Sequence, residues 1–202
     1  RQAHHTIQRA AGVLGLGRAA VRPIACDAQS RMDVVDLRLA LAADRAANVL
    51  PIAVVANAGT TNTGAIDPIA DIAAVAREYG LWLHVDGAYG LPGILDPRRT
   101  AQYRGLEHAD SAIVDPHKWL GAATGIAATF VRDRGFLERA FTQEPADYLE
   151  GSIETVDEAP GPPAHSLDDF GTPYFDYGVE LSAPARGVVV WALLKEIGVE
   201  GM

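Results

Sequence analysis

The stretch LWLHVDGAYG, residues 81–90, decides the fold of this chain. Its first half, Leu81 to Val85, is an apolar run of the length expected for a buried strand, and it leads directly into Asp86. The earlier run PIAVVAN, residues 51–57, predicts a second strand, and the segment between the two predicts a helix from Pro68 to Tyr79. Strands that alternate with helices in this way predict an open α/β sheet.

The rest of the chain extends this pattern on both sides. Further helices are predicted from His4 to Leu16, from Asp33 to Asn48, from Asp133 to Thr142 and from Ala183 to Ile197, and further strands from Val21 to Cys26, from Ser111 to Val114 and from Gly125 to Val131. Residues 143–178 contain five Pro and four Gly and predict a long irregular segment. We therefore expect a core at residues 1–142, an acidic flexible loop at 143–178, and a helix at 179–202 that leads toward a missing domain. The first residue is Arg1, and the chain stops just after a helical pattern, so we expect a fragment of a longer chain.

Charge and composition exclude several classes of function. Of the 26 acidic residues, nine lie at residues 143–178, which contain no Lys or Arg, so the remaining 17 equal the 17 basic residues. No basic surplus is left for a phosphate backbone, and nucleic-acid binding is not expected. No apolar run reaches the roughly 20 residues of a membrane-spanning helix. The single cysteine, Cys26, excludes an internal disulfide and a cysteine-based zinc cluster, and it fits a cytoplasmic protein.

Polar residues follow three successive predicted strands: Thr60 and Thr61 the first, Asp86 the second, and Asp115, His117 and Lys118 the third. Ligands of an open α/β sheet bind beyond the carboxyl ends of its strands, so these side chains are expected in one pocket. A carboxylate and an amine in one pocket form either a buried ion pair or a site for a cofactor that needs both. Pyridoxal 5'-phosphate (PLP) is such a cofactor. Only two of the 17 basic residues are lysines, which makes Lys118 a residue to explain.

Four segments carry a resemblance to a known family. They are QAHHTIQRA (residues 2–10), NAGTTNTGAIDP (57–68), HVDGAYG (84–90) and DSAIVDPHKWL (110–120). In this order they resemble the core of the group II PLP-dependent amino-acid decarboxylases, which act on aromatic amino acids, glutamate, histidine, tyrosine or diaminobutyrate. The resemblance implies the large domain of a fold-type-I PLP-dependent enzyme, with a mostly parallel central sheet flanked by helices.

The resemblance also implies roles for individual residues. Lys118 matches the lysine that forms the Schiff base with PLP, and Asp86 matches the carboxylate that pairs with the protonated ring nitrogen. His4 matches the histidine that stacks on the ring, with His5 as the alternative if the alignment shifts by one residue. Ala88 matches the small residue on the opposite face of the ring.

Further matches concern the edge of the ring and the catalytic step. Thr61 matches a threonine near the ring substituents, and His117 is placed near the phosphate and the reacting centre. Asp115 stands where many relatives have Asn near the phosphate, so its extra negative charge leaves its role open. Tyr148 matches a tyrosine on a mobile loop that closes over the neighbouring subunit's site and protonates the substrate carbon. Asp67 also lies near this site in the family, but its position before a proline predicts a helix cap.

The sequence therefore predicts a PLP-dependent carboxy-lyase that converts an L-amino acid to an amine and CO2, working as a homodimer with its site at the subunit interface. Two alternatives stay open: an aldehyde-forming PLP-dependent deaminase or other carbon-carbon lyase, and a non-catalytic dimerisation or binding module of the same fold. A metal site is not expected, because His84 and Asp86 are predicted to project to opposite faces or ends of one strand.

Overall fold

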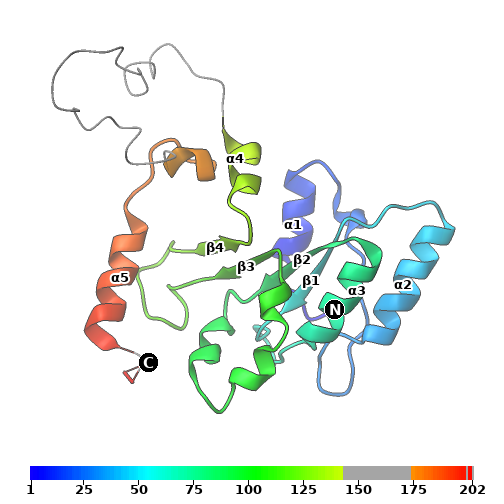
Figure 1. The fold of residues 1–202 in the computed structure, drawn as a ribbon, viewed down its shortest axis with the longest axis horizontal. Helices are drawn as coiled ribbons and strands as arrows, with labels where there is room; N and C mark the ends of the chain where they lie inside the picture. Colours follow the sequence, from blue (N-terminus) through cyan, green and yellow to red (C-terminus); the bar gives the residue numbers. More distant parts are fainter. Residues whose placement is uncertain (143–173, 199, 202) are drawn as a thin grey trace, which may run out of the picture. The chain divides into compact units, whose positions relative to one another are not determined.

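The computed structural model describes residues 1–142, 174–198 and 200–201. Its helices are α1 (Thr6–Val13), α2 (Val34–Ala46), α3 (Ile69–Tyr79), α4 (Gly135–Phe141) and α5 (Arg186–Ile197), and its strands are β1 (Ala53–Asn57), β2 (Trp82–Asp86), β3 (Ser111–Val114) and β4 (Ala128–Val131) (Figure 1). Short 3-10 turns at Arg18–Ala20, Leu91–Leu95, Thr100–Tyr103, Leu106–His108 and Tyr174–Tyr177 complete the described elements. The predicted helices are present, and most begin or end within a few residues of the predicted positions.

The four strands form one sheet in the order β1-β2-β3-β4. β1, β2 and β3 run parallel, and β4 pairs antiparallel with β3. The register pairs Asn57 of β1 with Asp86 of β2, and His84 of β2 with Ser111 of β3. Three strands therefore end at one edge of the sheet, as the sequence predicted.

Two predicted strands differ from the structure. The segment from Val21 to Cys26 forms only an isolated bridge between Cys26 and Met32, so the prediction of a strand there is wrong. Pro23 lacks an N–H group, and such a residue cannot donate to a strand ladder. The last strand begins at Ala128 rather than at Gly125, where the backbone has a φ of +89° that a strand does not adopt.

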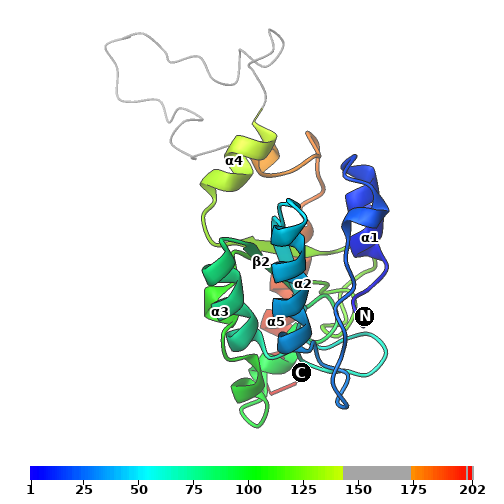
Figure 2. The ribbon, with the colours of Figure 1, turned by 90° about the vertical axis from the view of Figure 1, so that its right-hand side faces the viewer.

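The hydrophobic core lies on one face of the sheet. Leu83 and Val85 of β2 are buried there under α3, which buries Ile69, Ile72 and Val75 against the strands. Helix α2 adds Leu37 and Leu41 to the same core, and its N-terminus is capped as predicted by the Asp33 carboxylate, which accepts from the Val35 N–H at 2.8 Å. Helix α1 lies on the other side of the sheet (Figure 2). The alternating side chains of β2, which are Trp82, His84 and Asp86, are only half-buried and face that side.

Close backbone packing joins the segments that follow β1 and β2. A β-carbon built on Gly90 would lie 2.5 Å from the Cα of Gly59, and one built on Gly59 would lie 2.6 Å from the Cα of Gly90. Gly59 also has a φ of +93°, which L-residues with a side chain rarely adopt. Glycine at both positions therefore lets these two segments meet at the carboxyl edge of the sheet.

Among the described residues, those at 133–142 and 174–186 belong to one compact unit, and those at 1–132, 187–198 and 200–201 belong to another. Within the smaller unit, the Tyr177 hydroxyl donates to the Glu138 carboxylate at 3.3 Å, and Arg186 pairs with Glu180 at 2.5 Å. The predicted division at residues 142 and 178 stays a prediction. In the described part of the chain, no helix combines the length and apolarity that a bilayer crossing requires.

Asp67 does not cap α3, so that prediction is wrong. Asp67 is 2% exposed, and its carboxylate accepts three hydrogen bonds from other segments, from the Met32 N–H at 2.6 Å, the Asn57 N–H at 2.7 Å and the Asn57 side-chain amide at 2.9 Å. It therefore ties the segment before α2 to the end of β1.

We expect Asp67→Asn to lower the free energy of unfolding by about 1–3 kcal/mol, because an amide offers one acceptor oxygen and turns its NH2 toward a buried donor. The measurement is denaturant unfolding followed by circular dichroism. Asp71→Asn, an exposed position in the first turn of α3, is the control and should cost less than about 1 kcal/mol. Equal losses in the two variants would contradict the role assigned to Asp67.

Candidate cofactor-binding site

A cavity of about 420 Å³ lies at the carboxyl edge of the parallel strands, and we refer to it as the Lys118 cavity. It is lined by Gln2, His4, Thr6, Ile7, Asn57, Gly59, Thr60, Thr61, His84, Asp86, Ala88, Tyr89, Ile113, Asp115, His117 and Lys118. The structure thus brings together every predicted site residue that lies within the described part of the chain. Tyr148 lies outside the described residues.

Lys118 forms an ion pair inside this cavity, with its Nζ 2.7 Å from the Asp115 carboxylate. The Asp115 side chain is 13% exposed and the Lys118 side chain 34% exposed, so water still reaches the amine. The sequence left open whether an ion pair or a cofactor explains this lysine. Here the partner of the amine is Asp115, one turn before it, rather than Asp86.

Asp86 ends β2 and is half-buried in the cavity. Its carboxylate accepts from the Ala88 N–H at 3.1 Å, a local turn contact that leaves most of its acceptor capacity for a ligand. Its position is fixed by the backbone, because its carbonyl accepts from the Ala58 N–H at 2.8 Å across the sheet edge. Ala88 itself is half-buried and lines the cavity with a side chain of one carbon.

His117 is half-buried, and its Nδ1 lies 2.6 Å from the Ile126 carbonyl oxygen. A carbonyl oxygen only accepts, so Nδ1 carries the proton and donates. The other ring nitrogen, Nε2, is left for the cavity. It accepts a hydrogen bond when the ring is neutral and donates one when the ring is charged.

The loop after β1 contributes two neighbouring threonines with different roles. Thr60 is 4% exposed, and its hydroxyl contacts the Thr63 hydroxyl at 2.8 Å and accepts from the Ala65 N–H at 3.2 Å. Thr61 is exposed and lines the cavity, so its hydroxyl is accessible to a ligand. Thr60 therefore shapes the loop that presents Thr61.

The two candidate histidines near the N-terminus are placed differently. His4 lines the cavity, and its Nδ1 contacts the Thr6 hydroxyl at 2.8 Å. His5 precedes α1 and is not among the lining residues, although the two rings lie 4.1 Å apart. The geometry favours His4 for contact with a ligand.

His84 and Tyr89 line the cavity but were not predicted as site residues. The expectation that His84 and Asp86 project apart is wrong, because residues two apart on a strand share a face. This period of two was the signal that could have identified His84. Tyr89 stacks on Trp119 with ring centroids 5.9 Å apart. Within the described residues, no three His, Cys, Asp or Glu side chains group as metal ligands.

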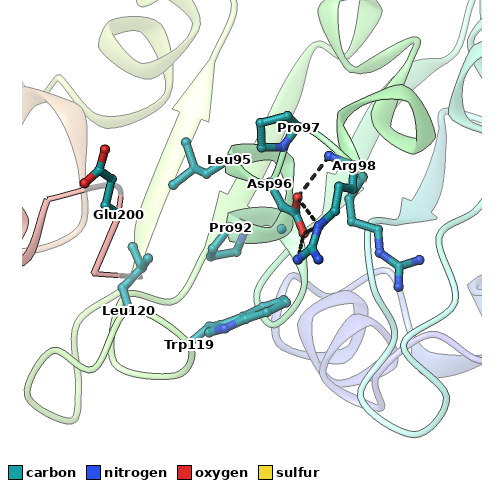
Figure 3. A pocket seen from close by; sticks show the side chains of 10 residues that line it. Pro92, Leu95, Asp96, Pro97, Arg98, Trp119, Leu120 and Glu200 are labelled. Atoms are coloured by element: carbon teal, nitrogen blue, oxygen red, sulfur yellow. Dashed lines mark hydrogen bonds and ion pairs between the residues drawn. The ribbon is translucent and has the colours of Figure 1, made fainter.

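A second and larger cavity, of about 840 Å³, lies beside Trp119 and Leu120 (Figure 3). One of its two arginines, Arg98, is bound by Asp96, with nitrogen-oxygen distances of 2.8–3.1 Å (Figure 3). This cavity contains neither Lys118 nor Asp86. Size therefore does not identify the site, and the reactive groups favour the smaller cavity.

Comparison with known proteins shows which proteins this chain is similar to. The chain is 34% identical to an aromatic-L-amino-acid decarboxylase of Bacillus atrophaeus over 198 residues, which is 98% of this chain and 38% of that protein. It is 30% identical to a 4-hydroxyphenylacetaldehyde synthase of Rhodiola rosea, covering 100% of this chain and 38% of that protein. It superimposes on a crystal structure of Oryza sativa TDC with PLP and tryptamine with a TM-score of 0.85 and 29% identity, covering 99% of this chain and 39% of that chain.

The chain thus spans about two fifths of the length of these relatives. Its whole length, residues 1–202, matches the family model described as the pyridoxal-dependent decarboxylase conserved domain. The chain belongs to the pyridoxal-dependent decarboxylase family.

Proposed function

We propose that this chain forms the cofactor-binding part of a PLP-dependent amino-acid decarboxylase that releases CO2 and an amine. The observation that carries the proposal is the Lys118 cavity, where one amine, two carboxylates and three imidazoles line the space at the end of three parallel strands. The residues present fit PLP. The Lys118 amine suits its aldehyde, and the Asp86 carboxylate suits its ring nitrogen.

The chemistry needs few groups from the protein. When bound, PLP accepts the electron pair released as the bond between the substrate Cα and its carboxylate breaks. Lys118 would hold the cofactor covalently, and the negative charge of Asp86 would keep a proton on the ring nitrogen. His4 and Ala88 would enclose the two faces of the ring, and Thr61 its edge.

Proton return completes the balance, because the Cα that loses CO2 must gain one proton to give the amine. We assign this step to Tyr148, assisted by Nε2 of His117, whose Nδ1 is already committed to the Ile126 carbonyl oxygen. His117 also suits the cofactor phosphate, since a charged imidazole donates to an anion.

The remaining features of the proposal concern the whole protein. We propose a cytoplasmic homodimer in which residues 143–178 act as a loop over the site of the neighbouring subunit, with residues 1–142 as core and 179–202 leading to a further domain. The single cysteine, Cys26, supports a reducing compartment. The dimer rests on the family resemblance.

We expect the protein with PLP to convert at least one L-amino acid to its amine with equal amounts of CO2. A panel of aromatic and acidic amino acids, analysed by mass spectrometry, tests this. Lys118→Ala should lose on the order of 100-fold or more in rate, because it removes the covalent anchor. Lys195→Ala, at the other lysine, is the control and should be unchanged.

A different product pattern would decide against this reaction. The similarity to a 4-hydroxyphenylacetaldehyde synthase makes aldehyde formation the second candidate function. Aldehyde, ammonia and peroxide in place of amine would establish that alternative. A folded protein that neither binds PLP nor forms any product would establish a non-catalytic module instead.

We expect Asp115→Asn to bind PLP about twofold to fivefold more tightly. Attachment at Lys118 must break the 2.7 Å pair with Asp115, and a partly exposed pair contributes about 0.5–1 kcal/mol. Removing this carboxylate also removes a negative charge near the cofactor phosphate. The measurement is a titration followed by the absorbance of the cofactor.

Asp71→Asn serves as the control for net charge, because Asp71 is exposed on α3 and lies outside the cavity. It should leave the PLP affinity unchanged. Weaker binding by the Asp115 variant would show that this carboxylate helps to hold the cofactor or to orient the lysine.

A further inference from the structure

One face of β2 carries a row of three polar-tipped side chains, Trp82, His84 and Asp86. The opposite face carries Leu83 and Val85, which are 1% and 0% exposed in the core. Nothing in the proposed function uses His84, yet it is half-buried in the Lys118 cavity, one step before Asp86 on the same face. A residue that only filled space there would not need an imidazole.

The ring of His84 is hydrogen-bonded to Ser111, which is itself hydrogen-bonded to Trp82. The Trp82 indole N–H lies 2.8 Å from the Ser111 hydroxyl oxygen, and this oxygen lies 2.8 Å from Nδ1 of His84. The parallel register places Ser111 directly beside His84 on β3, so the contact follows from the sheet itself.

The direction of these two hydrogen bonds determines the tautomer of His84. An indole nitrogen only donates, so Ser111 accepts from Trp82. Ser111 is 9% exposed, and Nδ1 of His84 is the acceptor that the described residues offer to its hydroxyl proton. If Nδ1 of His84 donated to Ser111 instead, the buried hydroxyl proton of Ser111 would have no acceptor, which is unfavourable. Nδ1 of His84 therefore accepts, and the proton of the neutral ring is on Nε2.

The protonation state of His84 determines whether a positive charge lies near the Asp86 carboxylate. Burial lowers the pKa of His84 from its usual value of 6.5, and the negative charge of Asp86 opposes this shift in part. The ring therefore stays uncharged at neutral pH and becomes a cation only in acid. Besides His84 and Asp86, the ionisable groups lining the cavity are His4, Tyr89, Asp115, His117 and Lys118. Among them, Lys118 is held by Asp115.

We propose that His84 is a positioning residue for the cofactor. The hydrogen bonds from Trp82 to Ser111 and from Ser111 to His84 hold the ring in its neutral form. The Asp86 carboxylate therefore has no cation beside it on β2, and its negative charge acts on the ring nitrogen of PLP. A charged His84 would attract Asp86 and weaken its attraction for the protonated cofactor ring. This inference rests on the proposed function, in which Asp86 faces that nitrogen.

The test compares PLP affinity between pH 5 and 8 in the unaltered protein and in His84→Gln, whose amide cannot take up a proton. The two affinities should agree within about twofold at pH 8. As the pH falls through the titration of His84, the unaltered protein should lose about threefold to tenfold relative to the variant. The other ionisable groups of the cavity and the cofactor itself are present in both proteins, so the ratio of the two affinities reports the change at position 84.

Control variants separate this effect from folding and from histidine content. His108→Gln removes an exposed histidine outside the cavity and should retain the pH profile of the unaltered protein. His84→Asn also cannot titrate and keeps an oxygen that can accept from Ser111, so it replaces His84→Gln if that variant does not fold. A purely structural role for His84 would change the affinity by the same factor at every pH.

A second measurement needs no cofactor. Nitrogen chemical shifts of His84 at pH 8 should show an unprotonated Nδ1 and a protonated Nε2, with a titration midpoint below 6.5. A protonated Nδ1 at pH 8, or an affinity ratio that does not change with pH, would overturn the inference while PLP binding stands. Absence of PLP binding in the unaltered protein would instead overturn the proposed function, and this inference with it.

Discussion

The close contact between Gly59 and Gly90 is the constraint on which the site depends. A side chain at either position would meet the other segment's backbone at about 2.5 Å, so only glycine lets the segments after β1 and β2 pack directly together. One of these segments presents Thr61, and the other follows Asp86 and contains Ala88. The contact therefore places a hydroxyl, a carboxylate and a small side chain around one cavity, with the third parallel strand supplying Lys118.

Strand β2 combines the two demands on the molecule, stability and chemistry. Its core-facing side chains, Leu83 and Val85, are buried against α3, and this burial supplies the hydrophobic stabilisation. Its other face is free to carry His84 and Asp86, whose polar groups would be unfavourable in the core. The rigid, buried face fixes the positions of the ionisable groups on the opposite face to the precision that a cofactor site requires.

The sequence predicted the carboxyl ends of β2 and β3 to within one residue, because a run of apolar residues followed by a charged one marks both a buried strand and its exit from the sheet. For this reason Asp86, Asp115 and Lys118 were expected in one pocket, and the structure brings them together. The sequence did not predict hydrogen bonds between residues that lie far apart along the chain. The anchoring of Met32 by Asp67 and the link from Trp82 through Ser111 join residues 35 and 29 positions apart, and no local pattern encodes such contacts.

The central claim is that PLP attaches to one particular lysine. The protein would be incubated with PLP, reduced with borohydride, digested, and the adduct located by mass spectrometry. The account predicts a single adduct on Lys118, the lysine in the cavity with Asp86. Equal labelling of Lys195, the other lysine of the chain, or no labelling of the folded protein, would contradict it.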